Sequence, residues 1–102
     1  ICEKTLRPIN CKRMFIVLGP AGVLKLLHSK GFETFGDIID ESYDAIEDAE
    51  ERFLAVVQAV EQFCQLDLAT VKDYYRNNSQ KFSRNWHTMK QLLQNEIGKI
   101  NV

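Results

Sequence analysis

Eight carboxylates gather between residues 37 and 51 of this 102-residue sequence, with no basic residue among them. Carboxylate oxygens are the ligands that a hard divalent cation such as Ca²⁺ prefers. Their spacing, however, does not match the calcium-binding loop of an EF-hand. On a helix, Asp37, Asp40, Glu41 and Asp44 would share one face, which indicates a solvated surface or a contact for a basic partner rather than a metal site.

The turn Gly-Pro-Ala-Gly at residues 19–22 is a second place where chemistry could occur, because glycine lets the backbone approach a phosphate closely. It lacks the third glycine of G-x-G-x-x-G and the Gly-Lys-Ser/Thr ending of a P-loop. Pro20 also removes one of the N–H groups that a phosphate would need. The segment therefore favours a plain strand-to-helix turn, with proline in the first turn of the helix.

The histidines and cysteines form no recognisable ligand set. His28 and His87 each lack a Cys, Asp or second His at ligand spacing. Cys2, Cys11 and Cys64 are odd in number and contain no C-x-x-C spacing, which argues against a disulfide framework and a zinc site. We therefore expect no metal centre, and a reducing, cytoplasmic environment.

Two N-terminal segments carry a resemblance to a known family. The sequence EKTLRPI at residues 3–9, followed by FIVLGP at residues 15–20, resembles the C-terminal, donor-binding half of GT-B glycosyltransferases, particularly fucosyltransferase-like enzymes. In those enzymes an E-K helix precedes an apolar strand that ends in Gly-Pro. The stretch through GFETF (31–35) and DESYD (40–44) is also similar to uncharacterised proteins of marine phages and bacteria, so the matches cover roughly the first half of the chain.

The resemblance implies a nucleotide-sugar site at Glu3, Lys4, Arg7 and Gly19, with no catalytic residue assigned. Glu3 would accept hydrogen bonds from the ribose hydroxyls, since a carboxylate offers two acceptor oxygens. Lys4 and Arg7 would neutralise the diphosphate, where negative charge develops during transfer, and the helix after Gly19 would add N–H groups. A complete GT-B enzyme has two Rossmann-like domains, so the chain would be a C-terminal fragment that is not active alone.

The composition is that of one folded globular domain covering residues 1–102. Apolar residues make up 45% and charged residues 26% of the chain. The net charge of −1 gives no overall attraction to nucleic acid or to an anionic membrane. Apolar stretches such as residues 15–18 and 54–57 are too short to span a bilayer. We expect neither a nucleic-acid partner nor a membrane span.

The hydrophobic pattern predicts a predominantly helical α/β domain that begins with a half-Rossmann-like unit. The apolar run at residues 14–18 predicts a buried parallel strand, and residues 32–35 predict a second. With a helix at about 21–29 between them, they would form a strand-helix-strand unit within residues 1–36. A two-stranded sheet is marginal alone, so helices, another chain or a missing N-terminal domain would complete it.

Residues 37–102 form the helical part of the prediction. Its three helices are expected at about 48–66, 68–77 and 79–97. Asp48 and Asp67 are expected to cap the first two, and Gly98 to end the third. The apolar residues of the first helix fall on one face, which we expect to pack inward: Phe53, Val56, Val57, Val60, Phe63 and Cys64.

Three functional hypotheses follow from the sequence. The first is a nucleotide-sugar-binding fragment of a longer glycosyltransferase-like protein, which agrees with a chain that begins at Ile1 without an initiator methionine. The second is a non-enzymatic helical interaction module whose acidic segment contacts a partner. One form of this hypothesis gives the module a viral origin. The third is a homo-oligomer in which the strand at 14–18 pairs across a symmetry axis, so that its edge is not exposed.

Overall fold

The computed structural model describes residues 3–100, without the side chains of residues 3–5 and 99–100. Within this part of the chain the elements are helical: α1 (Glu3–Asn10), α2 (Val23–Ser29), the 3-10 helix η1 (Ser42–Ala45), α3 (Ala49–Cys64), α4 (Leu68–Asn77) and α5 (Ser79–Ile100). None of these helices is long and apolar enough to cross a membrane.

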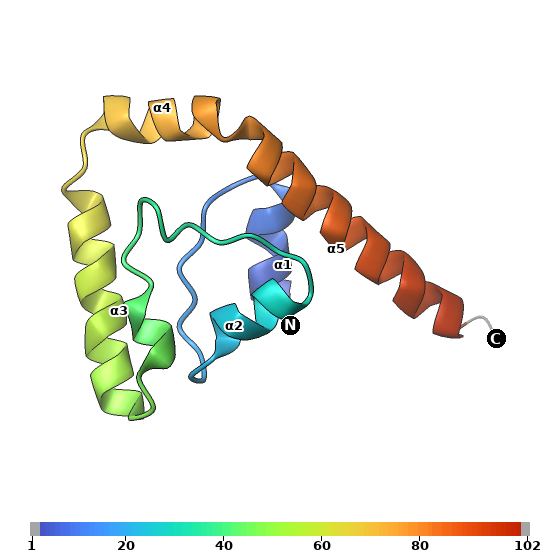
Figure 1. The fold of residues 1–102 in the computed structure, drawn as a ribbon, viewed down its shortest axis with the longest axis horizontal. Coiled ribbons are helices and arrows are strands. Elements are labelled where there is room, and N and C mark those ends of the chain that lie inside the picture. The colour runs from blue at the N-terminus through green and yellow to red at the C-terminus, as the bar shows by residue number, and fades with distance from the viewer. Residues whose placement is uncertain (1–2, 101–102) are drawn as a thin grey trace.

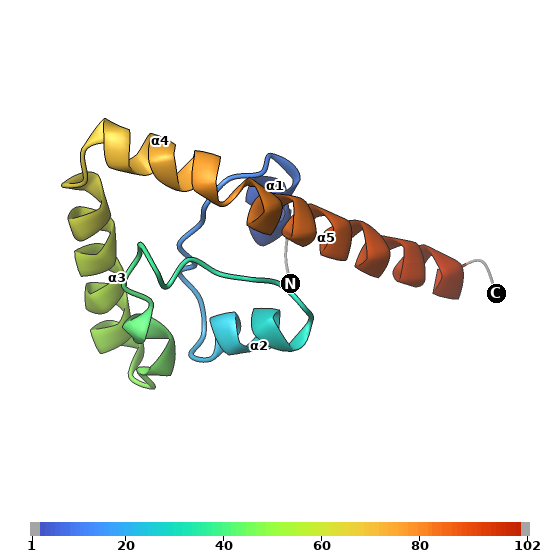
Figure 2. The ribbon, with the colours of Figure 1, turned by 45° about the horizontal axis from the view of Figure 1, so that its top comes forward.

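The three C-terminal helices form an angular frame around the rest of the chain. In Figure 1, α3 stands at the left, α4 crosses the top and α5 descends to the right, while α1 and α2 lie inside this frame. Helix α1 packs against α5, and η1 packs against both α2 and α3. The C-terminal turns of α5 extend beyond the other elements in Figures 1 and 2.

The predicted strand-helix-strand unit is wrong, because residues 3–100 contain no strand. Residues 14–18 form neither helix nor strand, and side-chain hydroxyls accept hydrogen bonds from two of their N–H groups. The N–H of Met14 donates to the hydroxyl of Tyr75 at 3.1 Å, and the N–H of Val17 donates to the hydroxyl of Tyr43 at 3.3 Å. Each buried N–H needs a partner, and a phenol oxygen meets that need as well as a strand does.

Residues 32–35 follow the same rule. The N–H of Glu33 donates to Oδ1 of Asn85 at 2.8 Å, and the amide of Asn85 donates back to the carbonyl of Glu33 at 2.9 Å. This reciprocal pair imitates the bonds between two strands, although its second member is a helical side chain. The regular elements of residues 3–100 are therefore all helical, and the half-Rossmann fold class is corrected accordingly.

Aromatic side chains from both extended segments build the centre of the core. Phe35 is fully buried and lies edge-on to Phe15, with ring centroids 5.1 Å apart. Phe82 of α5 stacks on Phe35 at 5.4 Å, and Tyr74 of α4 meets it edge-on at 6.3 Å. Because large apolar rings contribute much of the free energy of burial, these contacts bind the frame to the inner loops.

Most predicted helix boundaries are confirmed. Asp48 accepts a hydrogen bond from the N–H of Glu51 and so caps α3, and Asp67 caps α4 in the same way. Gly31 ends α2 at a φ of 95°, a left-handed conformation that glycine adopts without a steric penalty. The prediction that Gly98 ends the last helix is wrong, since α5 continues to Ile100.

Candidate functional site

The residues of the predicted nucleotide-sugar site belong to different parts of the fold. The side chains of Glu3 and Lys4 lie outside the described residues. Arg7 is exposed on α1, which packs against α5. Gly19 lies near the start of α3, where its carbonyl accepts a hydrogen bond from Nε of Arg52 at 2.7 Å. The site itself stays a prediction.

The acidic run is largely used inside the fold rather than presented on one helical face. The carboxylate of Asp44 accepts hydrogen bonds from the N–H groups of Leu24 and Lys25, at 2.9 and 3.1 Å, and so holds the start of α2. Asp48 caps α3, and Asp40 accepts from the N–H of Ser42. Reversing these charges would disturb the structure before it tested any partner.

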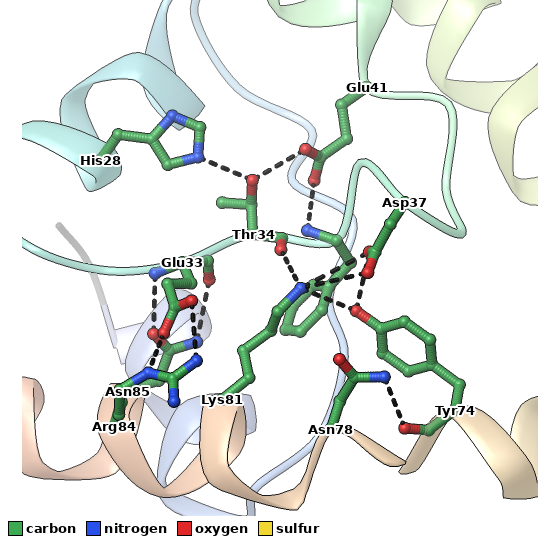
Figure 3. Close-up of polar contacts among 11 residues, drawn as sticks. His28, Glu33, Thr34, Asp37, Glu41, Tyr74, Asn78, Lys81, Arg84 and Asn85 are labelled. Atoms are coloured by element: carbon green, nitrogen blue, oxygen red, sulfur yellow. Dashed lines mark hydrogen bonds and ion pairs between the residues drawn. The ribbon is translucent and has the colours of Figure 1, made fainter.

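A network of polar side chains connects the loop at residues 33–41 to α4 and α5, as Figure 3 shows. The amine of Lys81 donates to the carbonyl of Thr34 at 3.1 Å and to the hydroxyl of Tyr74 at 2.9 Å. That hydroxyl donates in turn to Asp37 at 2.8 Å. Burial and the hydrogen bond to Asp37 raise the pKa of Tyr74 well above its ordinary value, so Tyr74 stays neutral and serves as a connector.

The same figure shows an arrangement that resembles part of a catalytic triad. Nε2 of His28 lies 2.7 Å from the hydroxyl oxygen of Thr34, and that hydroxyl donates to Glu41 at 2.8 Å. In a working triad the acid orients the histidine, whereas here Glu41 contacts the hydroxyl. Thr34 is also buried, with 8% of its surface exposed. The arrangement therefore fixes the loop and offers no nucleophile to a substrate.

Metal chemistry has no basis in the part of the chain that the structure describes. No group of three or more His, Cys, Asp or Glu side chains there could hold a metal ion. Cys11 and Cys64 are free and exposed.

One apolar face of α3 is not buried in the core. Phe53, Val57, Val60 and Cys64 are all exposed and follow the spacing i, i+4, i+7, i+11, so they form one line along the helix. We call these four residues the α3 stripe. Phe53 is 49% exposed, although a phenylalanine is usually buried.

Charge around the α3 stripe has one sign. Glu50 and Glu61 lie three or four residues from stripe members and so border it on one side. Neither carboxylate forms an ion pair with another residue of the described chain. The one basic residue of α3, Arg52, turns the other way and donates to the carbonyls of Gly19, Ile46 and Glu47. The surface is therefore apolar with an acidic border.

The inward orientation predicted for the apolar face of α3 is wrong for most of its members. Of the six residues, only Val56 is buried and Phe63 is partly buried, while the four of the α3 stripe face solvent. Burial centres instead on Val56 and Ala59, which contact the core. The spacing of apolar residues revealed a helix face, but it could not say what covers that face. In the sequence, the indication that part of this face is exposed was the width of the apolar face together with Glu50 and Glu61 at its border.

Comparison of the chain with protein-family models, with curated proteins and with solved structures found no match. A function for this chain is therefore inferred from the geometry of the molecule.

Proposed function

We propose that this chain is a non-enzymatic helical interaction module whose α3 stripe binds a basic amphipathic helix of a partner protein. The observation that carries the proposal is an exposed apolar line bordered by carboxylates without partners. Contact between water and apolar side chains is unfavourable, so a partner that covers the apolar surface of the stripe gains binding free energy. The unpaired Glu50 and Glu61 would then select a positively charged partner.

A helix is the partner element that fits the shape of this surface. The α3 stripe runs straight for about 16 Å along one helix, at 1.5 Å per residue. Helices that recognise such surfaces present apolar anchors at i, i+3, i+4 and i+7, a helical period that the stripe shares. No strand of this chain is free for pairing within residues 3–100, so strand addition is not a comparable route.

The alternatives have less support from the geometry. Pairing two α3 stripes with each other would bring carboxylate borders together, which is unfavourable. Oligomerisation by pairing of a strand at residues 14–18 is not supported, because these residues form no strand. Nucleotide-sugar binding rests on the resemblance of the N-terminal segments alone, and no described contact joins Arg7 to Gly19 in one site.

A synthetic helix tests the proposal directly. The probe is a fluorescein-labelled peptide of about 18 residues, made of leucine on one face and lysine on the other, and binding is followed by fluorescence anisotropy. We expect saturable binding that weakens about tenfold or more in the double variant Phe53→Gln, Val57→Gln, because apolar contact area is lost. The control Leu68→Gln removes a leucine that is 67% exposed outside the stripe and should bind as the unmodified chain does.

Charge-reversed variants and peptides separate specific recognition from non-specific hydrophobic binding. The double variant Glu50→Lys, Glu61→Lys should lose affinity for the lysine peptide and gain affinity for a peptide with glutamate in place of lysine. Equal binding of both peptides by the unmodified chain would refute the proposal. So would full binding by the Phe53→Gln, Val57→Gln variant, provided that circular dichroism shows it folded.

A further inference from the structure

Helix α5 carries a second stripe with the same spacing as the first. Trp86, Lys90, Leu93 and Ile97 again follow i, i+4, i+7, i+11, and we call them the α5 stripe. Leu93 is 44% exposed and Ile97 is 56% exposed. Leu93 also lines a pocket with Leu6 of α1, and Ile97 lies one turn nearer the C-terminal end of α5.

The charge around the α5 stripe is opposite to that around the α3 stripe. The amine of Lys90 lies 4.5 Å from the centre of the Trp86 ring, and the amine of Lys12 lies 5.7 Å from the same centre. Neither lysine forms an ion pair with another described residue. Glu96, the one acid in α5, lines a pocket together with Leu93 and with Leu6 of α1, so it borders the α5 stripe on the side of that pocket. The α5 stripe is therefore a basic amphipathic surface.

We infer that the α5 stripe of one copy of this chain binds the α3 stripe of a second copy. This inference rests on the proposed function, since it names the basic helix that the α3 stripe would bind. The two stripes have the same residue spacing, so the exposed side chains of Leu93 and Ile97 can meet apolar side chains of the α3 stripe. Lys90 of the α5 stripe, and Lys12 beside it, would lie near the carboxylates that border the α3 stripe.

The charge distribution of the whole sequence agrees with this pairing. Residues 37–66, which include α3, contain nine carboxylates and one arginine. The rest of the chain contains twelve basic residues and five acidic ones. Opposite charge at the two ends of one molecule favours encounters in which the acidic end of one copy meets the basic end of another.

One copy cannot join its own two stripes, because α3 and the projecting turns of α5 lie at opposite ends of a molecule that measures 48 Å in its longest direction. The contact would therefore use different surfaces on the two copies. Such a heterologous contact continues from copy to copy as a ring or a filament.

Sedimentation velocity on the full chain tests the inference. The unmodified chain should form species larger than a monomer as its concentration rises towards about 1 mM. The α3 variant Phe53→Gln, Val57→Gln and the α5 variant Leu93→Gln, Ile97→Gln should each remain monomeric. The control Leu68→Gln should associate as the unmodified chain does.

Mixing the two variants gives the decisive result. Each keeps one intact stripe, and the two intact stripes are complementary, so an equimolar mixture should form a one-to-one dimer and nothing larger. A mixture that remains monomeric, an α5 variant that associates alone, or an unmodified chain that stays monomeric would each overturn the inference. If the chain is monomeric while the lysine peptide still binds the α3 stripe, the proposed function stands and only this inference falls.

Discussion

At the scale of single residues, Lys81 joins three parts of the fold. Its amine contacts the carbonyl of Thr34 and the hydroxyl of Tyr74, and it lies 3.5 Å from the carboxylate of Asp37. It also lies 5.4 Å from the centre of the Phe35 ring. Only 14% of its side chain is exposed, so water cannot easily replace these partners.

Replacing Lys81 should therefore lower the stability of the chain. We expect Lys81→Met to reduce the free energy of unfolding by about 1–3 kcal/mol, because several buried polar groups lose a donor. Arg76→Met is the matched control, since Arg76 and Asp73 form an ion pair that is largely exposed. Its effect should be within about 0.5 kcal/mol. Urea unfolding followed by circular dichroism measures both, and equal losses would contradict this role of Lys81.

The ion pair between Glu33 and Arg84 predicts how stability depends on pH. The hydrogen bond from Arg84 is the main cause that lowers the pKa of Glu33 below its ordinary value of 4.5. A lowered pKa in the folded state stabilises the fold above pH 4.5, and this contribution disappears as the pH falls through the folded-state value.

The variant Glu33→Gln should therefore be less stable than the unmodified chain at pH 7. In strong acid, where Glu33 is protonated in both the folded and the unfolded protein, the two should be equally stable. Thermal unfolding over a pH series would show the two curves converging on the acid side. A difference that persists or grows as the pH falls would mean that the carboxylate charge is not the cause.

At the scale of elements, the sequence predicted the helices well and the extended segments poorly. Caps are local: Asp48 and Asp67 act on N–H groups three residues ahead, so their position in the sequence is sufficient evidence. The N–H groups of Met14, Val17 and Glu33 instead donate to Tyr75, Tyr43 and Asn85, which lie 61, 26 and 52 residues away in the sequence. A β-like apolar pattern could not show that these side chains would take the place of a second strand.

Gly31, which follows the end of α2, and Gly98, which lies within α5, give a matched pair of glycine substitutions. Gly31→Ala should destabilise the chain by about 1–2 kcal/mol, since its φ of 95° is unfavourable for a residue with a Cβ atom. Gly98→Ala should instead stabilise the chain by up to about 1 kcal/mol, because Gly98 is helical and a Cβ there would meet nothing within 4 Å. Thermal unfolding compares the two. A loss of stability in Gly98→Ala would indicate that α5 ends before this residue.

The candidate site shows where prediction from sequence stops. The spacing of Phe53, Val57 and Val60 predicted an apolar helix face, and that face exists. Whether it is buried depends on which loops reach it, and burial falls on Val56 and Ala59 instead. The carboxylate of Asp44 illustrates the same limit, since its contacts with the N–H groups of Leu24 and Lys25 become visible only in three dimensions.

At the scale of the whole molecule, charge is separated between the acidic α3 region and the basic remainder of the chain. Binding of the lysine peptide to the α3 stripe should weaken severalfold when sodium chloride rises from about 0.05 M to about 0.5 M, because salt screens exposed charges. The Glu50→Lys, Glu61→Lys variant should lose this dependence or invert it. Anisotropy titrations at several salt concentrations measure the effect, and an affinity independent of salt would remove the electrostatic part of the proposal.

The position of the bound peptide on the chain shows whether the α3 stripe is its binding surface. In ¹H–¹⁵N spectra of labelled chain titrated with unlabelled lysine peptide, we expect the largest shift changes at the amides of residues 50–64. The amides of α1 and of residues 33–41 should change little. Changes centred on α1 or the 33–41 loop, with α3 unaffected, would contradict the claim that the exposed face of α3 is the binding surface of this protein.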